Sequence, residues 1–308
     1  MRILVAVCVT ACLTVVLGGT SDAVIYGLKS EDSYNNPSKG QVSGAPTRLF
    51  SFAEGGAAFT DIGLVRVSGT GIDADGLALS PSASLFAFQL TEVNDFTGVP
   101  RTSRLVSIDP STAVASVIGS GSWLARDIRG AAFDASGSLW AVDARNDQLL
   151  TVNPATGAVV GTPVGLTSGG GAFDLGSTCD IAFLSSGGLY LISGTNIYAV
   201  NAVTGSLSLL YTDTGYGYAG AAFSIGAHYG DLFTYEINGA DDIYRLDAAF
   251  ARTTVFANII PSFNAGRGDL AGPLDASGGG IIPEPLTMLG MFLGLGSVGA
   301  YIRRRRSA

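Results

Sequence analysis

Short runs of alternating hydrophobic and polar residues recur along this chain, and each run breaks at a turn before the alternation resumes. One such element begins at Leu49, Arg104, Leu149, Ile197 and Ile243. Its turns carry residues that favour chain reversal, as in Asp109-Pro110 and the segment NPATG at 153–157. Proline presets one turn dihedral, the Asp or Asn side chain bonds nearby backbone, and glycine accepts a positive φ. The pattern predicts a β-hairpin in each copy.

A second strand–turn–strand element precedes four of these hairpins, beginning at Gly76, Gly130, Asp180 and Gly220. Together the two elements form four antiparallel strands in a unit of about 40 to 55 residues, which is the period of a β-propeller blade. No such unit buries its apolar faces alone, because neighbouring blades cover one another. The sequence therefore predicts an all-β protein, a β-propeller of four-stranded blades.

The two ends of the repeat region indicate how the ring closes. The first copy lacks a leading element, whereas the segment DLAGPLDASGGG from Asp269 resembles DIRGAAFDASGS from Asp127. A C-terminal strand that completes the first blade removes the exposed edges and gives five blades. Six blades are the alternative if 24–34 or the loop around Asp95 adds strands. A stacked solenoid and a two-sheet sandwich are the other architectures that the repeats allow.

The N-terminal residues differ from the repeats. A basic start at Arg2 precedes an apolar run over 3–17, and small residues follow up to Ala23. This order predicts a signal peptide with a helical core over residues 1–23, cleaved after Ala23. Lipid attachment at Cys12 is the alternative. The expected domains are the signal peptide, the repeat domain over 24–276, and a glycine linker with an apolar tail over 277–308.

The C-terminal tail has three parts in a fixed order. Pro283, Glu284 and Pro285 come first, and prolines hold the backbone extended. Residues 286–302 follow without a charge, at the lower length limit for a transmembrane helix. The chain then carries a basic cluster of Arg303, Arg304, Arg305 and Arg306. By the positive-inside rule this cluster stays in the cytoplasm and the repeat domain lies outside.

This tail resembles the PEP-CTERM sorting signal of Gram-negative bacteria, over roughly residues 281–307. The resemblance implies processing by an exosortase, a membrane cysteine transpeptidase, at the Pro283-Glu284-Pro285 motif. It also implies transient anchoring in the membrane, followed by delivery to the cell surface or the exopolysaccharide matrix. A permanent tail anchor is the alternative reading of the same residues.

Composition narrows the classes of partner. The formal net charge is −8, and the repeat domain is more acidic than the whole chain because Arg2 and the terminal arginines lie outside it. Phosphate binding needs clustered cations, so nucleic acid is not an expected partner. Removal of the signal peptide leaves Cys179 as the single cysteine, which excludes an intramolecular disulfide.

Several residues are of types that could bind a metal or phosphate or act as a nucleophile, but a structural role explains them better. His228 is the only histidine, so no zinc site can be built from histidines. Cys179 precedes a predicted strand, where a small packed thiol is the better interpretation. Asp73 and Asp75 could bind calcium, yet Leu77 breaks the EF-hand spacing. The glycines at 169–171 lack the Lys-Ser/Thr ending of a P-loop.

Aromatic residues offer one further possibility, a platform on which sugar rings stack if the side chains gather on one face. The candidates are Trp123, Trp140, Tyr190, Tyr198, Tyr216, Tyr218 and Tyr244.

No catalytic, metal-binding or cofactor-binding set emerges from these residues. The sequence therefore predicts a non-enzymatic binding or structural module outside the cytoplasmic membrane, whose expected partners are an exosortase, the membrane through its tail, and exopolysaccharide or envelope proteins. The alternative is a secreted propeller hydrolase or lyase. That function needs carboxylates clustered around the central channel with perturbed acidities.

Overall fold

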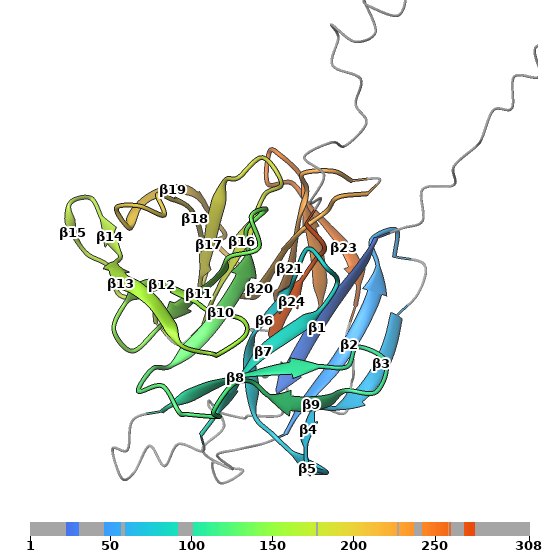
Figure 1. Ribbon diagram of the computed structural model, residues 1–308. Coiled ribbons are helices and arrows are strands. Elements are labelled where there is room, and N and C mark those ends of the chain that lie inside the picture. Colours follow the sequence, from blue (N-terminus) through green and yellow to red (C-terminus); the bar gives the residue numbers. More distant parts are fainter. Residues whose placement is uncertain are drawn as a thin grey trace, which may run out of the picture.

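The computed structural model describes residues 23–30, 46–56, 59–91, 101–176, 178–226, 228–236, 242–257, 259 and 268–274. Over these residues the protein is a five-bladed β-propeller, and Figure 1 shows the five sheets arranged around a common axis. The prediction of an all-β propeller with five blades is confirmed. The predicted signal helix and C-terminal helix lie outside the described residues.

The first blade contains both ends of the described chain. Its strand order from the axis outward is β24-β1-β2-β3, formed by β24 (Gly268–Ala271), β1 (Val24–Ser30), β2 (Thr47–Ala53) and β3 (Phe59–Leu64). The C-terminal strand β24 pairs antiparallel with β1, with Tyr26 opposite Ala271. The predicted closure is therefore correct. The strand at 24–30 fills the second position of this blade, so the six-blade alternative based on it is wrong.

The second and third blades follow in sequence. The second is built from β6 (Ala74–Leu79), β7 (Leu85–Leu90), β8 (Ser103–Ile108) and β9 (Val114–Val117), extended by β4 (Arg66–Val67) and β5 (Thr70–Gly71). The third is built from β10 (Ile128–Phe133), β11 (Leu139–Asp143), β12 (Gln148–Val152) and β13 (Val159–Gly165). In both blades the predicted hairpins appear where the alternating pattern placed them.

The fourth and fifth blades repeat this design. The fourth is built from β16 (Cys179–Phe183), β17 (Leu189–Ser193), β18 (Asn196–Val200) and β19 (Ser206–Thr212), extended by β14 (Thr167–Ser168) and β15 (Gly171–Ala172). The fifth is built from β20 (Tyr218–Phe223), β21 (Leu232–Glu236), β22 (Ile243–Leu246) and β23 (Arg252–Phe256). The short outer hairpins β4–β5 and β14–β15 were not predicted.

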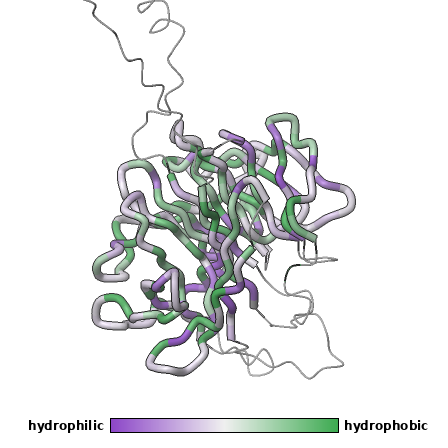
Figure 2. Tube along the Cα trace, turned by 90° about the vertical axis from the view of Figure 1, so that its right-hand side faces the viewer, coloured by the Kyte–Doolittle hydropathy of each residue, from purple (hydrophilic) through white to green (hydrophobic). Residues whose placement is uncertain are grey.

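Hydrophobic cores lie between blades. Among the described residues there are five buried apolar clusters, and each combines side chains from two adjacent blades. One example joins Phe88 of the second blade to Leu139 of the third. Figure 2 shows the hydrophobic stretches running through the body of the ring. Because every core is shared, the stability of one blade depends on its neighbours.

Aromatic pairs reinforce three of these junctions. A ring on the second strand of one blade contacts the phenylalanine that ends the inner strand of the next. The ring centroids lie 5.4 Å apart for Phe86 and Phe133, 6.1 Å for Trp140 and Phe183, and 4.9 Å for Tyr190 and Phe223. Such tilted and edge-on contacts add stability beyond the area that they bury.

The first and fifth blades are also joined by a buried carboxylate. The Glu54 side chain accepts hydrogen bonds from the Ser224 hydroxyl (2.6 Å) and from the backbone N–H groups of Ile225 and Gly226 (3.0 Å each). Glu54 is 1% exposed. These bonds cross the junction at which the two ends of the ring meet, so they support its closure.

The turn between β6 and β7 contains a strained alanine, which leads to a stability prediction. Ala83 has φ 59°, whereas Gly137 and Gly187 occupy the equivalent positions of the next blades with φ 84° and 94°. An alanine in this region costs more than a glycine. Replacing Ala83 with glycine should therefore raise the free energy of unfolding by about 0.5–1 kcal/mol in urea denaturation.

The matched control for this substitution is Ala135→Gly in the turn between β10 and β11. Ala135 is not among the residues with positive φ. Glycine there adds freedom to the unfolded chain without relieving strain, so it should lower stability. Equal effects of the two substitutions would contradict the strain at Ala83.

Candidate functional site

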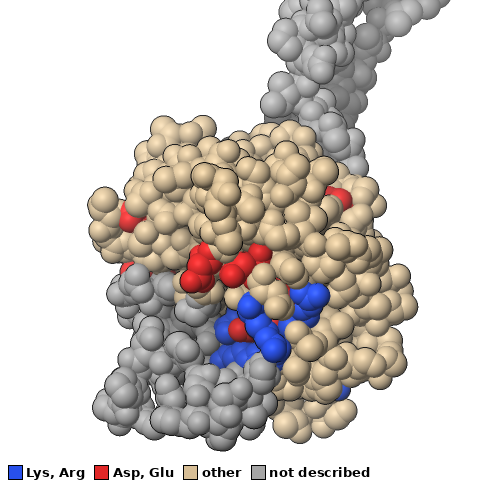
Figure 3. Space-filling view, turned by 90° about the vertical axis from the view of Figure 1, so that its left-hand side faces the viewer, with Lys and Arg blue, Asp and Glu red and all other residues tan. Residues whose placement is uncertain are grey.

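The axis of the ring is the place where functional residues of a propeller could converge. Its wall is formed by the inner strands β24, β6, β10, β16 and β20, which contact one another in this order around the ring. One end of the axis carries charged residues on or just before the inner strands, such as Asp75 and Arg129, whereas the inner strands end on apolar residues such as Phe133 and Phe183. Figure 3 shows Lys, Arg, Asp and Glu side chains gathered in one area of the face that it views.

Two arginines lie among the carboxylates at the polar end. Arg129 on β10 is 3.6 Å from the Asp75 carboxylate and 2.7 Å from that of Asp127. Arg101 is 4.0 Å from Asp73. Burial opposes the charge of Arg129, but the carboxylates of Asp127 and Asp75 outweigh burial and raise the pKa of its guanidinium. These arginines neutralise much of the negative charge at this end of the axis.

Asp180 on β16 and Asp269 on β24 form a buried carboxyl pair deeper in the ring, and both are 0% exposed. Each carboxylate connects two blades. Asp180 accepts from its neighbour Ile181 N (2.7 Å) and from Ala221 N of the fifth blade (2.6 Å). Asp269 accepts from Leu270 N (2.8 Å) and from Leu77 N of the second blade.

The two carboxyl groups also interact electrostatically, and besides burial the negative charge of Asp180 raises the pKa of Asp269. Burial raises the pKa of both Asp180 and Asp269, and the negative charge of Asp75 raises them further. Two adjacent buried carboxylates cannot both ionise at low cost. The pair therefore retains one proton under conditions in which an exposed Asp is charged.

The fold explains why this pair fits at the axis. In the five inner strands, Gly76, Gly130 and Gly220 occupy the position that Asp180 and Asp269 occupy in the other two. A Cβ on Gly130 would lie 2.5 Å from Asp180 Cα, and one on Gly220 would lie 2.9 Å from Leu270 N. Glycine on one strand thus makes room for the aspartate strand beside it.

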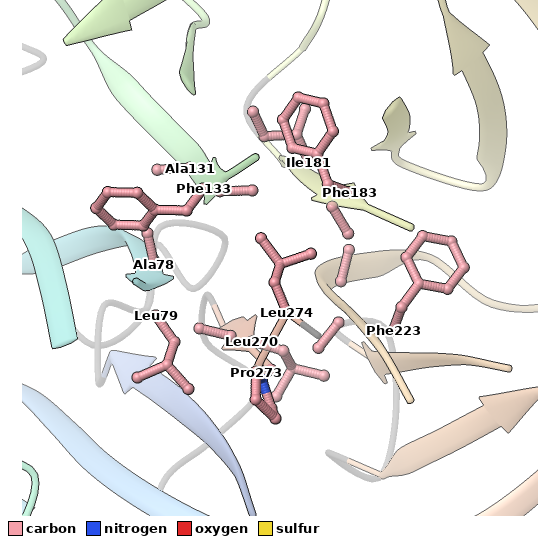
Figure 4. A pocket seen from close by; sticks show the side chains of 16 residues that line it. Ala78, Leu79, Ala131, Phe133, Ile181, Phe183, Phe223, Leu270, Pro273 and Leu274 are labelled. Atoms are coloured by element: carbon pink, nitrogen blue, oxygen red, sulfur yellow. The ribbon is translucent and has the colours of Figure 1, made fainter. Parts of the chain in front are cut away.

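The apolar end of the axis is filled. Figure 4 shows the rings of Phe133, Phe183 and Phe223 around Leu274, the last described residue of the chain. The cavity left there measures about 20 Å³, which is room for roughly one water molecule. Over the described residues, this end of the axis offers no space for a small-molecule substrate.

A second polar cluster joins the fourth and fifth blades. The Asp213 carboxylate accepts from the Tyr218 hydroxyl (2.6 Å) and lies 3.5 Å from Arg252. Burial would raise the pKa of Asp213, yet the Tyr218 hydroxyl, backbone N–H groups and Arg252 together lower it. The Arg252 guanidinium stacks 3.7 Å from the ring centroid of Tyr216 and 4.8 Å from that of Tyr244. The charges of Asp213 and Arg252 compensate each other, so this cluster connects the fourth and fifth blades.

The structure does not combine His228, Cys179, Asp73 and Asp75 into one catalytic or metal-binding group. His228 is half-buried in the loop between β20 and β21. Cys179 is 2% exposed, and burial raises the pKa of its thiol, which keeps it a poor nucleophile. Asp73 and Asp75 face different arginines, and no group of three or more His, Cys, Asp or Glu side chains in the described part of the chain is arranged to hold a metal.

The structure does not bring the aromatic candidates together in one exposed platform. Tyr218 is fully buried and Tyr198 and Tyr244 nearly so. Trp123 is 40% exposed, with Arg104 stacked 4.5 Å from its ring centroid. Gly169 and Gly170 form the turn of the outer hairpin β14–β15, Gly171 begins β15, and the next described element is the strand β16.

The sorting residues Pro283, Glu284 and Pro285 and the basic cluster Arg303, Arg304, Arg305 and Arg306 lie outside the described residues, and their role stays a prediction. Within the described ranges, no helix is long and apolar enough to span a membrane.

Sequence reasoning missed Asp180 and Arg129 and misplaced Asp269. It equated Asp269 with Asp73 and Asp127, which precede their inner strands, whereas Asp269 lies inside β24. The segments DGLAL, RGAAF, CDIAF, AGAAF and GDLAG, aligned strand by strand, carry the missed signal. In that alignment two aspartates replace a glycine of the repeat.

No protein-family model matches the chain, and no curated protein matches it. Similar solved structures include a protein of unknown function from Bacteroides thetaiotaomicron (12% identity, TM-score 0.49, 83% of this chain and 66% of that chain). A streptogramin B lyase (11%, 0.34, 67% and 61%) and a putative gluconolactonase (17%, 0.42, 62% and 66%) are also similar. The chain thus spans 61% of the lyase chain. At these identities and TM-scores the names carry no argument about the chemistry of this protein.

Proposed function

We propose that the protein is a non-enzymatic binding or structural module of the cell surface or extracellular matrix, exported and then delivered through its C-terminal sorting signal. The order of the Pro283-Glu284-Pro285 motif, an apolar segment and an arginine cluster supports the delivery route. In this proposal an exosortase-type enzyme processes the tail, and the membrane holds the protein only until that step.

The observation that carries the non-enzymatic role is the state of the carboxyl groups at the axis. Asp180 and Asp269 are fully buried, and each oxygen accepts a backbone N–H, in part from a neighbouring blade. A general acid or base must reach the proton that it transfers. These two carboxyls connect neighbouring blades and are not exposed to solvent in the described part of the protein.

The clustered carboxylates with raised pKa are also the feature that a channel hydrolase or lyase would need, so this function is the second candidate. The other carboxylates at the polar end are Asp73, Asp75 and Asp127. Asp75 and Asp127 lie against Arg129, and Asp73 lies 4.0 Å from Arg101. A carboxylate that is already paired with an arginine is less available to a substrate. The geometry therefore favours the binding or structural role.

The first and last described residues, Ala23 and Leu274, lie on the same face of the ring, and this position bears on the delivery proposal. Ala23 lies beside Glu54 and the loop after β20, and Leu274 lies at the apolar end of the axis. Glu54 N donates to the Ala23 carbonyl at 3.0 Å. Signal cleavage directly after Ala23 removes this bond, whereas cleavage before Ala23 keeps it.

The test is the intact mass of the protein recovered from the exterior of the producing cell. We expect one N-terminus near Ala23 and one C-terminus near Pro285. A variant with Pro283, Glu284 and Pro285 all replaced by alanine should keep its tail and stay in the membrane fraction. The matched control replaces three residues of the preceding glycine linker, Gly278, Gly279 and Gly280, and should be processed normally. A full-length chain in the cytoplasm would contradict the proposal.

A further inference from the structure

A groove lies between the second and third blades, on the face of the ring that carries the first and last described residues, Ala23 and Leu274. It is bordered by the turn between β6 and β7, the turn between β10 and β11, and Pro154 of the turn between β12 and β13. Its volume is about 310 Å³, at the lower end of the range for small-molecule sites. We call it the interblade groove.

The floor of the interblade groove is aromatic. Phe86 of β7 and Phe133 of β10 pack together there with their ring planes tilted by 54°. Phe133 is 3% exposed and Phe86 is half-buried, so the floor is held rigidly by the core beneath it. Rigid rings of this kind offer an apolar contact at little entropic cost.

The rim of the groove carries hydroxyl groups. Ser82 and Ser84 come from the turn of the second blade and Ser136 from the equivalent turn of the third. The Ser80 and Ser82 hydroxyls lie 3.0 Å apart, and the Ser136 hydroxyl donates to Asp134 at 2.6 Å. A hydroxyl has one donor and two acceptor sites, so these groups keep capacity for a ligand.

No Lys, Arg, Asp or Glu is among the described residues that line the groove. The nearest carboxylate, Asp134, accepts from Ser136, from Ser138 N and from Trp140 Nε1 (2.9 Å each for the last two). Burial would raise the pKa of Asp134, but these bonds together lower it. A charged ligand would lose water here without gaining an ionic partner, which is unfavourable. The lining thus favours a neutral ligand.

We propose that the interblade groove binds a neutral saccharide unit, with the apolar face of the sugar ring on Phe86 and Phe133 and its hydroxyls on the serine rim. A sugar ring combines an apolar face with a hydroxyl edge, which matches the floor and rim of the groove. This inference deepens the proposed binding role and rests on it. It assigns the ligand class and the position at which the ligand sits.

The structure supplies a matched pair of variants. Ser82 and Ser186 occupy equivalent exposed positions in the turns of the second and fourth blades, and only Ser82 lines the interblade groove. Ser82→Leu narrows the groove and removes a rim hydroxyl. Ser186→Leu makes the same chemical change elsewhere. Equal thermal melting of the two variants and the parent protein would show that the fold is intact.

The binding experiment is calorimetric titration of the exported protein with neutral oligosaccharides, namely cellopentaose, laminaripentaose, maltopentaose and xylopentaose, and with tetragalacturonate as the acidic comparison. We expect at least one neutral oligosaccharide to bind and tetragalacturonate not to bind. Ser82→Leu should weaken binding at least about tenfold through lost contacts and a lost hydrogen bond, and Ser186→Leu should leave it unchanged.

Three results would overturn the inference: no binding of any neutral oligosaccharide, preferential binding of tetragalacturonate, or equal weakening by both leucine variants. Binding of an unrelated neutral peptide, tetra-alanine, that Ser82→Leu abolishes would assign the groove to a different class of ligand and would also overturn it. None of these outcomes alters the intact mass or the location of the protein, so failure of this inference is distinguishable from failure of the proposed function.

Discussion

Replacing Gly130 with alanine should destabilise the protein by about 3 kcal/mol or more, or prevent folding, because the added Cβ overpacks a backbone contact. The Cβ would lie 2.5 Å from Asp180 Cα, 2.6 Å from Asp180 Oδ1 and 3.0 Å from Ile181 N. Two of these three atoms belong to the backbone of β16, which cannot turn aside as a flexible side chain can. The strand would have to move away from β10, and the cores on both sides of it would open.

The measurement is the thermal melting temperature and the free energy of unfolding in urea. The matched control is Gly165→Ala on β13, where a Cβ would meet nothing within 4 Å. This control should be neutral or slightly stabilising, because alanine reduces the freedom of the unfolded chain. If Gly130→Ala melted at the same temperature as the control, the close contact of β10 with β16 would be wrong.

The second large effect concerns pH. The pKa of the buried Asp180–Asp269 pair is raised by burial, so the folded protein holds a proton that the unfolded chain releases above about pH 4. The folded state then binds more protons than the unfolded state, and stability falls as pH rises. One retained proton changes the free energy of unfolding by up to about 1.4 kcal/mol per pH unit. We therefore expect the protein to be more stable at pH 5 than at pH 7, because the free energy of unfolding falls as the pair loses its proton.

Below about pH 4, the free energy of unfolding is expected to fall as the pH falls. Asp134 and Asp213 have lowered pKa values in the folded protein, so the stability that they contribute is lost as they become protonated. The two opposing effects predict a stability maximum near about pH 4 to 5.

Urea denaturation at pH 5, 6 and 7 measures the slope. Asp269→Asn removes one of the two coupled carboxyls and should flatten the dependence between pH 5 and 7. Asp109→Asn, in an exposed turn, is the control and should leave the slope unchanged because hydrogen bonds from Ser111 already lower the pKa of Asp109. A parent protein whose stability rises from pH 5 to pH 7 would show that the pair is not protonated.

Part of the candidate site was readable from the sequence. Asp73 and Asp75 were considered as calcium ligands, and Asp269 was recognised as the start of a segment that resembles the one from Asp127. Their roles were not readable, because the Asp180–Asp269 contact joins strands of the fourth and first blades. The lining of the interblade groove was hidden for the same reason, since Phe86 and Phe133 belong to different blades. The sorting motif at 283–285 depends on sequence alone and stays a prediction.

The sequence by itself predicted the repeated hairpins and their turns, the five blades as the preferred count, and the closure of the ring by the C-terminal strand. These features depend on period-two alternation and on turn residues such as Asp109-Pro110, which act within about fifteen residues of chain. Only the tertiary structure decided which side chains face the axis, that Asp180 and Asp269 are both buried there, and where a groove opens between blades. Those properties arise from packing between strands that are distant in sequence, and strand register places every side chain on one face or the other.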